Sequence, residues 1–382
     1  MAAVTSSCGV WTALGTDAEG ARLQRMRASP QYDAQEERFV NSLGNARTDG
    51  ASIVGQYLSS DAITRPDGPL PRDTTIASRL RTLPEGDLRV SWIGHSTMLI
   101  EIDGTRILTD PMFSDRASPA TWVGPLRFGP PALEIAELPP IDAVLISHDH
   151  YDHLDVASIR ALDAAGAPFF VPLGVGAHLE YWGVDPKQIT EMDWWEESRV
   201  DDVTIACLPS RHFSGRGLFN RDSTLWSSWA VIGPSNRVYF SGDTSLTPDF
   251  LEIGRRYGPF DIAMIESGAY NRLWPDSHLG PEQAVDAFQM VRGRLMLPIH
   301  WGTFTLGIHG WTEPMERLTR AAAERDVHLV IPVPGGSVLP SSPRTTKPWW
   351  PQIPWEGPEE HAIVSSNLPA FDLPAVLHPE PR

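Results

Sequence analysis

Three histidines and one aspartate with the spacing of metal ligands stand in one short segment of the chain. Residues 147–153 read Ser-His-Asp-His-Tyr-Asp-His, so His148, His150, Asp152 and His153 fall within six consecutive residues. Imidazole and carboxylate are ligands that suit zinc and similar divalent ions. In a loop, the first two histidines can point to one ion while Asp152 and His153 turn towards a second. The alternative is a polar loop that is rich in histidine by chance, and with 12 histidines in 382 residues this is the poorer explanation.

Three further polar residues each follow an apolar run that is typical of a buried strand. They are His212 after Val203–Leu208, Asp243 after Val238–Ser241, and His300 after Leu295–Ile299. Each one alone would be interpreted as a capping or loop residue. Together they recur at the same structural place as the 147–153 segment, which follows the apolar run Ala143–Ile146. We therefore expect seven ligands to meet at one centre that holds two divalent metal ions, with zinc the expected metal.

The hydrophobic pattern predicts the elements that must bring these residues together. Further strands are predicted at Leu88–Ile93, Met98–Ile102, Arg106–Thr109, Ser228–Ile232, Ile262–Ile265 and His328–Val333. Helices are predicted at Val156–Ala165, Phe250–Tyr257, Pro281–Val291 and Pro314–Arg325, and a proline suits the first turn of a helix. Strands followed by mixed strand–helix units, given twice in succession, indicate an α/β sandwich of two sheets with helices outside. The ligands would lie at the loop ends of the strands.

The chain divides into three regions. Residues 1–84 are polar and rich in loops, and we interpret them as an N-terminal extension that packs on the main domain. The main domain spans residues 85–340, and residues 341–382 form a Pro-rich C-terminal tail. The tail carries Trp349, Trp350 and Trp355, which we expect to pack against the domain instead of anchoring it in a membrane.

Composition excludes several classes of protein. The formal charge is 31 − 48 = −17, which argues against a nucleic-acid partner held by a broad basic surface. Cys8 and Cys207 form neither a disulfide framework nor a CxxC motif. No apolar stretch is long enough to span a membrane, and the first residues lack the basic and apolar regions of a secretory signal. We expect a cytoplasmic protein, and an exported form stays open if a leader precedes Met1.

Several segments resemble one branch of a known family. They are Gly94–Pro111, Asp142–Asp155, His212–Phe219 and Leu297–Phe304. These segments, within a likeness that runs from Leu88 to Val333, resemble the metallo-β-lactamase superfamily and, within it, the N-acylphosphatidylethanolamine-hydrolysing phospholipase D branch. The resemblance implies an αββα sandwich, in which two packed mixed β-sheets are flanked by helices.

The resemblance also implies a role for each ligand. His148, His150 and His212 would hold the first ion, Asp152, His153 and His300 would hold the second, and Asp243 would bridge the two. Two divalent ions, two aspartates and a bridging hydroxide leave a net charge of +1 (4 − 2 − 1), which suits an anionic phosphodiester. Asp152 and Asp243 would serve catalysis by holding the ions that activate the bridging water and stabilise the charge that develops on the phosphate.

Four neighbouring residues have two interpretations each. Tyr151 resembles a substrate-contacting position, or it packs beneath the loop. His278 resembles a substrate-contacting histidine that would donate a proton to the leaving alkoxide or hold a phosphate oxygen, or it only precedes a helix. Asp110 resembles a carboxylate that orients a ligating imidazole, or it caps a turn. His95 is interpreted as a structural histidine at a strand bend, in preference to a functional residue.

The leading hypothesis is a phosphodiesterase of phospholipase D type that acts on an N-acylphosphatidylethanolamine-like or other lipid substrate. The alternative is hydrolysis of a lactone, amide or other ester at the same two-metal site. A third hypothesis, a non-catalytic metal-binding protein, is disfavoured by the complete ligand set. The expected partner is a small-molecule or lipid substrate, and the sequence leaves open a peripheral membrane contact and a homo-oligomer.

Overall fold

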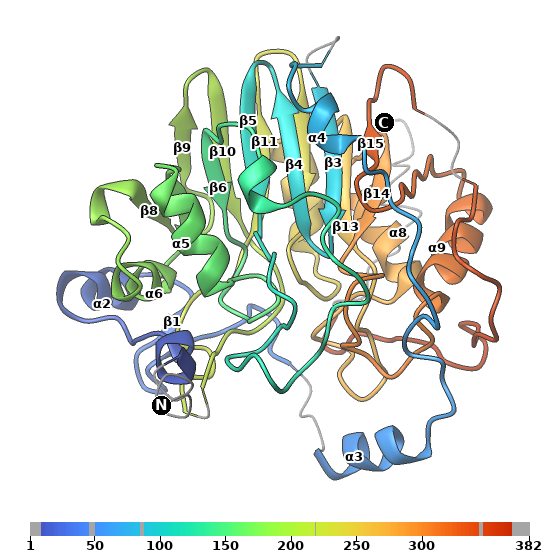
Figure 1. Cartoon of the computed structure of the whole chain (residues 1–382). Coiled ribbons are helices and arrows are strands. Elements are labelled where there is room, and N and C mark those ends of the chain that lie inside the picture. The colour runs from blue at the N-terminus through green and yellow to red at the C-terminus, as the bar shows by residue number, and fades with distance from the viewer. Residues whose placement is uncertain (1–8, 46–49, 85–87, 218, 344–346, 369–382) are drawn as a thin grey trace, which may run out of the picture.

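Two mixed β-sheets face each other in the computed structural model, which describes residues 9–45, 50–84, 88–217, 219–343 and 347–368 (Figure 1). The seven-stranded sheet has the order β15 (Ser337–Val338), β3 (Leu88–Gly94), β4 (Thr97–Ile102), β5 (Thr105–Thr109), β6 (Ala143–Leu145), β7 (Phe169–Pro172) and β8 (Ile189–Met192). The six-stranded sheet has the order β14 (Met296–Ile299), β13 (Ile262–Glu266), β12 (Arg237–Phe240), β11 (Ser228–Ile232), β10 (Val203–Leu208) and β9 (Glu197–Val200). Each sheet contains both antiparallel and parallel pairs. The predicted α/β sandwich is confirmed.

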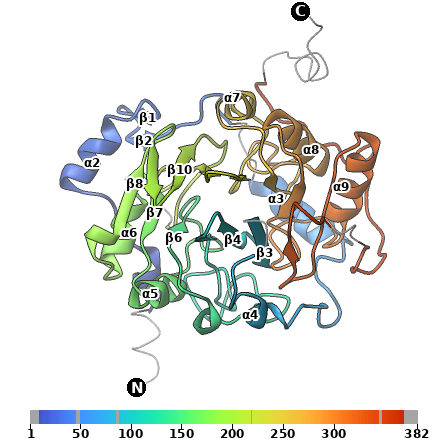
Figure 2. The same cartoon turned by 90° about the horizontal axis from the view of Figure 1, so that it is seen from above.

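Helices cover the outer faces of the two sheets (Figure 2). On the seven-stranded sheet these are α4 (Ile76–Arg79), α5 (Val156–Ala164) and α6 (Val175–Tyr181). On the other side lie α7 (Asp249–Arg256), α8 (Pro281–Met290) and α9 (Glu313–Glu324). Because one face of each sheet meets the other sheet and the opposite face meets helices, every residue of β3, β4 and β13 is buried. Strands of this kind show as continuous apolar runs, which is why their positions could be predicted.

The N-terminal region is tied to the sandwich by side chains. It contains α2 (Gly20–Arg27), β1 (Tyr32–Asp33), β2 (Arg38–Phe39) and α3 (Gly50–Ser59). Arg22 pairs with Glu180 and Glu191, each at 2.6 Å. Asn41 also contacts the main domain, where its Nδ2 donates to the backbone oxygen of His212 at 2.7 Å. The extension therefore contacts the backbone of a predicted metal ligand.

The C-terminal tail contributes aromatic side chains to the core. The Trp301 ring stacks on Trp92 with 5.4 Å between centroids, and Trp349 lies 5.2 Å from Trp301. Trp350 is buried against the same group. The expectation that the tail tryptophans pack is confirmed for Trp349 and Trp350.

One predicted strand is wrong. His328–Val333 does not form a strand, and only Leu329 makes an isolated bridge, to Met296. Pro332 and Pro334 have no N–H to donate to a ladder, so the chain leaves the six-stranded sheet. It pairs instead with β3 of the other sheet, through β15. No helix in the described ranges is long and apolar enough to cross a membrane.

Candidate metal centre

All seven predicted ligands meet between the two sheets, at the ends of strands. The loop after β6 supplies His148, His150, Asp152 and His153 from the seven-stranded sheet. The six-stranded sheet supplies the others: His212 after β10, Asp243 after β12, and His300 after β14. The parallel strands β12, β13 and β14 end at the same edge, which brings residues from distant parts of the sequence together.

Three histidine nitrogens converge on the first side of the centre, which we call the histidine side. His148 Nε2 lies 2.8 Å from His150 Nδ1, and His150 Nδ1 lies 3.3 Å from His212 Nε2. The outer nitrogens of two of these rings are already engaged. His212 Nδ1 donates to the backbone oxygen of Ser277 at 2.7 Å. A carbonyl oxygen only accepts hydrogen bonds, so the hydrogen is on Nδ1 and His212 Nε2 presents a lone pair to the centre.

Ser147 fixes the tautomer of His148 by similar logic. Its hydroxyl donates to Asp110 Oδ2 at 2.6 Å, so its oxygen is left to accept from His148 Nδ1 at 2.9 Å. His148 Nε2 therefore also presents a lone pair to the centre. Lone pairs from neighbouring rings that point at one place repel one another unless a cation lies between them. The donor set of the histidine side fits a divalent ion.

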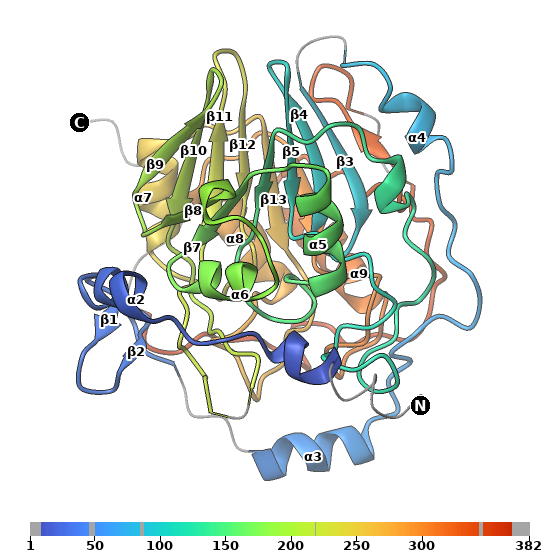
Figure 3. The same ribbon diagram turned by 60° about the vertical axis from the view of Figure 1, so that its left-hand side comes forward.

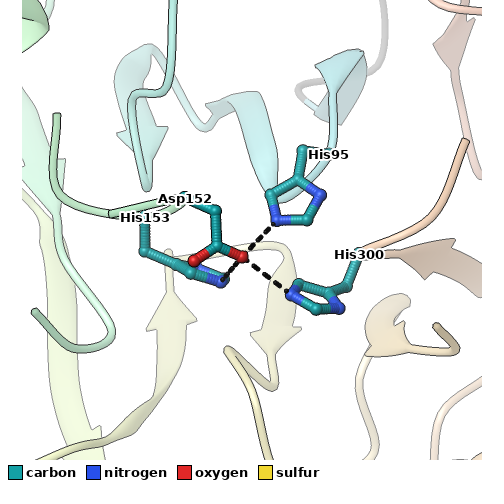
Figure 4. Close-up of side chains that lie close together, drawn as sticks. All are labelled: His95, Asp152, His153 and His300. Atoms are coloured by element: carbon teal, nitrogen blue, oxygen red, sulfur yellow. Dashed lines mark hydrogen bonds and ion pairs between the residues drawn. The ribbon is translucent and has the colours of Figure 1, made fainter. Parts of the chain in front are cut away.

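The second side of the centre, which we call the carboxylate side, contains Asp152, His153 and His300 (Figure 4). Asp152 Oδ2 lies 3.2 Å from Nε2 of both histidines. Asp243 Oδ2 also reaches both rings, at 3.2 Å from His153 Nε2 and 3.0 Å from His300 Nε2.

Asp243 touches both sides of the centre. Besides its contacts on the carboxylate side, its Oδ2 lies 3.9 Å from His148 Nε2 and 3.7 Å from His212 Nε2. Asp243 Oδ1 is buried and has no hydrogen-bond partner among the described residues. Buried polar atoms normally have a partner, so this oxygen fits a site that receives a cation. The bridging assignment of Asp243 stays a prediction, which this position supports.

Asp110 orients the ring of His153. It follows β5, and its Oδ2 accepts from His153 Nδ1 at 2.7 Å while Oδ1 accepts from the backbone N of Ser147. This is the contact expected of a carboxylate that holds a metal-ligating imidazole.

The backbone at three site residues is left-handed. The φ angle is 36° at Asp110, 54° at His95 and 63° at His300. Such angles are uncommon for residues other than glycine and cost free energy. Gly268 shows how tight the loops are, because a Cβ there would lie 2.1 Å from the backbone oxygen of His300.

Two residues near the centre were missed by the sequence reasoning. His95 lies at the bend between β3 and β4, as expected, but its Nε2 lies 2.9 Å from Asp152 Oδ2 and its ring is 4.3 Å from that of His300. Glu266 ends β13 and groups with Asp243, His278 and His300, so that one ligand atom of each lies within 4.8 Å of the others. The strand-end pattern of the seven predicted ligands could have identified Glu266, whereas nothing in the sequence indicates the contact of His95.

The structure places His278 beside the centre and Tyr151 against a neighbouring residue. His278 Nδ1 lies 3.2 Å from Glu266 Oε2 and 3.8 Å from Asp243 Oδ2. Tyr151 Oη donates to the backbone oxygen of Arg216 at 2.5 Å, and the Arg216 guanidinium lies over its ring. Tyr151 also lines a cavity of about 830 Å³ whose lining includes none of the seven ligands. These contacts are those of a packed side chain. The role of Tyr151 in substrate binding stays a prediction.

The pKa values differ between the two sides of the centre. Burial lowers the pKa of His148 and His212 well below that of a free imidazole, and it lowers the pKa of His150 to about 4. Burial also acts to lower the pKa of His300, but the charge of Asp243 and the hydrogen bonds to Asp152 and Asp243 raise it to about 10. The pKa of His153 is raised in the same way, by the charges of Asp243, Asp152 and Asp110. Without bound ions, protons on the carboxylate side occupy the place where a cation would balance the aspartates.

Comparison with known proteins agrees with this fold. The model of the beta-lactamase superfamily domain matches residues 105–301. An uncharacterized protein of Mycobacterium tuberculosis is 47% identical over 90% of this chain and 92% of its own length. The N-acyl-phosphatidylethanolamine-hydrolyzing phospholipase D 1 of Caenorhabditis elegans is 38% identical over 63% of this chain and 72% of its own length.

A solved structure shares the same fold. The metallo hydrolase Igni18 of Ignicoccus hospitalis superposes with a TM-score of 0.52 at 22% identity, over 66% of this chain and 97% of that one. The chain has two mixed sheets with a cluster of histidine and aspartate at their loop ends. These features are those of the metal-dependent hydrolases. The chain belongs to the metallo-β-lactamase superfamily, and its homologues include the phospholipase D of Caenorhabditis elegans.

Proposed function

We propose that this protein is a two-zinc phosphodiesterase of phospholipase D type, acting on an N-acylphosphatidylethanolamine-like or other lipid phosphodiester. The observation that carries the proposal is the arrangement of seven ligand side chains into two sides that share Asp243. The substrate class is supported by the 38% identity with an N-acyl-phosphatidylethanolamine-hydrolyzing phospholipase D.

The charge of the centre suits an anionic substrate. Two divalent cations contribute +4, ionised Asp152 and Asp243 contribute −2 and a hydroxide contributes −1, which leaves +1 in a protein whose net charge is −17. A phosphodiester carries one negative charge, so it would find a local attraction that the rest of the surface does not offer.

The residues divide the work of hydrolysis. His148, His150 and His212 would hold one ion, and Asp152, His153 and His300 the other, with Asp243 between them. Bound cations of this kind lower the pKa of a coordinated water and stabilise charge that develops on phosphoryl oxygens. His278 is 13% exposed and lies 3.8 Å from Asp243 Oδ2, so its ring would meet a substrate beside this aspartate.

Zinc is the metal that the donor set favours. Five of the seven side chains offer an imidazole nitrogen and the other two offer a carboxylate, and zinc prefers nitrogen and carboxylate ligands at low coordination number. Magnesium and calcium prefer sites made of oxygen. We therefore expect about two zinc ions per chain, measured by inductively coupled plasma mass spectrometry on the purified protein.

The activity test compares substrate classes on one preparation. Zinc-loaded protein is incubated with N-acylphosphatidylethanolamine, phosphatidylcholine, a nitrophenyl phosphodiester, a lactone and a β-lactam, and the products are identified by mass spectrometry. Release of a phosphatidic acid from a phospholipid is the expected result, and it should disappear in His150→Ala. Hydrolysis of the lactone alone would replace this proposal with the ester hydrolase alternative.

We also propose a peripheral contact with the lipid surface through α3. This helix contains no charged residue, and Val54 and Leu58 on it are 59% and 84% exposed. It stands at the loop end of the molecule, beyond the sheets (Figures 1 and 3). Apolar side chains on a short helix favour the interface of a bilayer. Leu58→Asp should slow hydrolysis of phospholipid vesicles and leave hydrolysis of the soluble nitrophenyl phosphodiester unchanged. An equal loss on both substrates would contradict a membrane role.

A further inference from the structure

Glu266 holds two consecutive residues of the loop that carries His278. Its Oε2 lies 3.2 Å from His278 Nδ1, and its Oε1 accepts from the backbone N of Leu279 at 2.7 Å. Glu266 is the last residue of β13 and is fully buried, whereas His278 lies 12 positions later, just before α8. The carboxylate of Glu266 therefore holds both the backbone of this loop, at Leu279, and the ring of His278.

The surroundings of Glu266 are those of a hydrogen-bond acceptor. The backbone N–H groups of Leu279 and Thr244 both point at its carboxylate. Within the described ranges, His278 is the side chain recorded at ion-pair distance from it, and no lysine or arginine is. Burial and the charge of Asp243 raise the pKa of this carboxyl, and the charge of His300 and the two backbone N–H groups act to lower it, so its recorded backbone hydrogen bonds are those that favour the ionised form.

The contact with Glu266 determines which nitrogen of His278 is left free for a substrate. Its Nδ1 lies between two carboxylates, at 3.2 Å from Glu266 and 3.8 Å from Asp243. A hydrogen on Nδ1 is favoured there, because carboxylate oxygens accept it. The ring is 13% exposed, and with Nδ1 directed at the two carboxylates its Nε2 is the nitrogen left for a substrate. Which nitrogen carries a hydrogen is set by the partner of the other nitrogen.

We propose that Glu266 is a positioning residue that holds His278 in one orientation and with its hydrogen on Nδ1, so that Nε2 is the atom presented to the substrate. The effect on catalysis rests on the proposed function, whereas the positioning itself does not. Glu266 is thereby distinguished from the seven ligands: it contacts the substrate-facing histidine and does not hold an ion.

The first experiment reads the hydrogen on His278 directly. Nitrogen-15 NMR of ring nitrogens is recorded on the zinc-loaded full chain labelled at histidine, and the signal missing in His278→Ala identifies this ring. We expect Nδ1 to carry a hydrogen in the parent, whether or not Nε2 also carries one. In Glu266→Gln the oxygen stays with Leu279 N and the NH₂ group faces Nδ1, so the hydrogen should leave Nδ1.

A matched control and the zinc content separate positioning from other roles. Glu313 is also buried and accepts from Tyr270 Oη at 2.9 Å, so Glu313→Gln removes a comparable charge away from His278 and should leave its signal unchanged. Glu266→Gln should keep the zinc content of the parent. A hydrogen on Nε2 alone in the parent, an unchanged His278 signal in Glu266→Gln, or loss of zinc in that variant would each overturn the inference, and the last would make Glu266 a ligand.

The second experiment asks whether the two residues act as a unit. With a phospholipid substrate, His278→Ala should lower kcat by on the order of a hundredfold, and Glu266→Gln should lower it in the same direction with little change in KM. The double variant should be no slower than His278→Ala alone, because a positioning residue has nothing left to position. Losses that multiply would contradict the coupling. If no phosphodiester is turned over, the proposed function fails while the NMR result still decides the positioning.

Discussion

The two sides of the metal centre are built on different principles. On the histidine side, Ser277 and Ser147 hold the outer nitrogens of His212 and His148, so neutral rings present lone pairs that await an ion. On the carboxylate side, two aspartates surround His153 and His300, and these rings keep their protons until an ion replaces them. The first side is prepared by hydrogen bonds and the second by charge. We expect the two ions to bind with different affinity and different pH dependence.

Removal of Asp243 should impair zinc binding on both the histidine side and the carboxylate side, because this carboxylate touches both. In Asp243→Ala we expect the zinc content to fall towards zero and hydrolysis to fall by more than the roughly 10- to 100-fold that is typical of losing an outer partner of a ligand. Asp201→Asn, at an exposed aspartate with a left-handed backbone, serves as the control. Full zinc content and full rate in Asp243→Ala would remove it from the centre.

Asp110 and Ser147 each hold the outer nitrogen of one ligating histidine, so replacing one or the other should weaken zinc binding on different sides of the centre. Asp110→Asn weakens the hold on His153, whereas Ser147→Ala removes the oxygen that accepts from His148. We expect Asp110→Asn to lower zinc affinity by roughly 10- to 100-fold, mainly on the carboxylate side. Ser147→Ala should act mainly on the histidine side, and stepwise zinc titration with a competing chelator measures both.

Equal weakening of both steps by both variants would show that Asp110 and Ser147 support the whole centre. It would contradict two separately prepared sides.

The pH dependence of zinc affinity should sharpen the comparison. Because the pKa of His300 is about 10 without ions, this ring is protonated at neutral pH, and binding must release its proton. Affinity on the carboxylate side should therefore rise about tenfold per pH unit for each proton released, up to about pH 10. The histidine side should change little above pH 5, because the pKa of His150 is about 4. Calorimetry in buffers of different ionisation enthalpy counts the released protons.

The raised pKa of His300 also predicts how the stability of the protein stripped of zinc depends on pH. A raised pKa contributes stability that is fully present below the unfolded value of about 6.5 and is lost as the pH rises through about 10. The melting temperature of the stripped protein should fall over this window more than that of the zinc-loaded protein. A parallel fall in both would assign the loss to groups outside the centre.

Tyr151→Phe should give the smallest effect. It removes a hydroxyl that donates to the backbone oxygen of Arg216, and one such hydrogen bond contributes about 0.5–1.5 kcal/mol to stability. Zinc content should not change on either side. A rise in KM larger than a few fold, measured on the phospholipid, would restore Tyr151 to substrate binding.

The ligands could be predicted because their chemistry coincides with a simple position in the fold. His212, Asp243 and His300 each follow a buried apolar run, and the ends of neighbouring strands meet at one edge. The same rule points to Glu266, which directly follows the predicted strand Ile262–Ile265, but it was not applied to that strand. The pattern failed where no local signal exists.

Three features could not be predicted for physical reasons. The contact of His95 with Asp152 depends on a left-handed turn and on a partner 57 residues away. Asn41 reaches the backbone of His212 across 171 residues, and no periodicity marks such a contact. Strand β9, Glu197–Val200, is a polar edge strand with alternating exposure, so it lacks the continuous apolar run by which the central strands were predicted.

The left-handed backbone at His95, Asp110 and His300 sets a limit on how this protein can be improved or can drift. Glycine adopts these angles without the cost that other residues bear, so glycine at any of the three would relieve strain. Asp110 bears this backbone cost because its carboxylate accepts from His153 and Ser147. Glycine there would relieve the strain and leave buried donors without a partner, so substitutions that raise the thermostability of an active enzyme are to be sought at other positions.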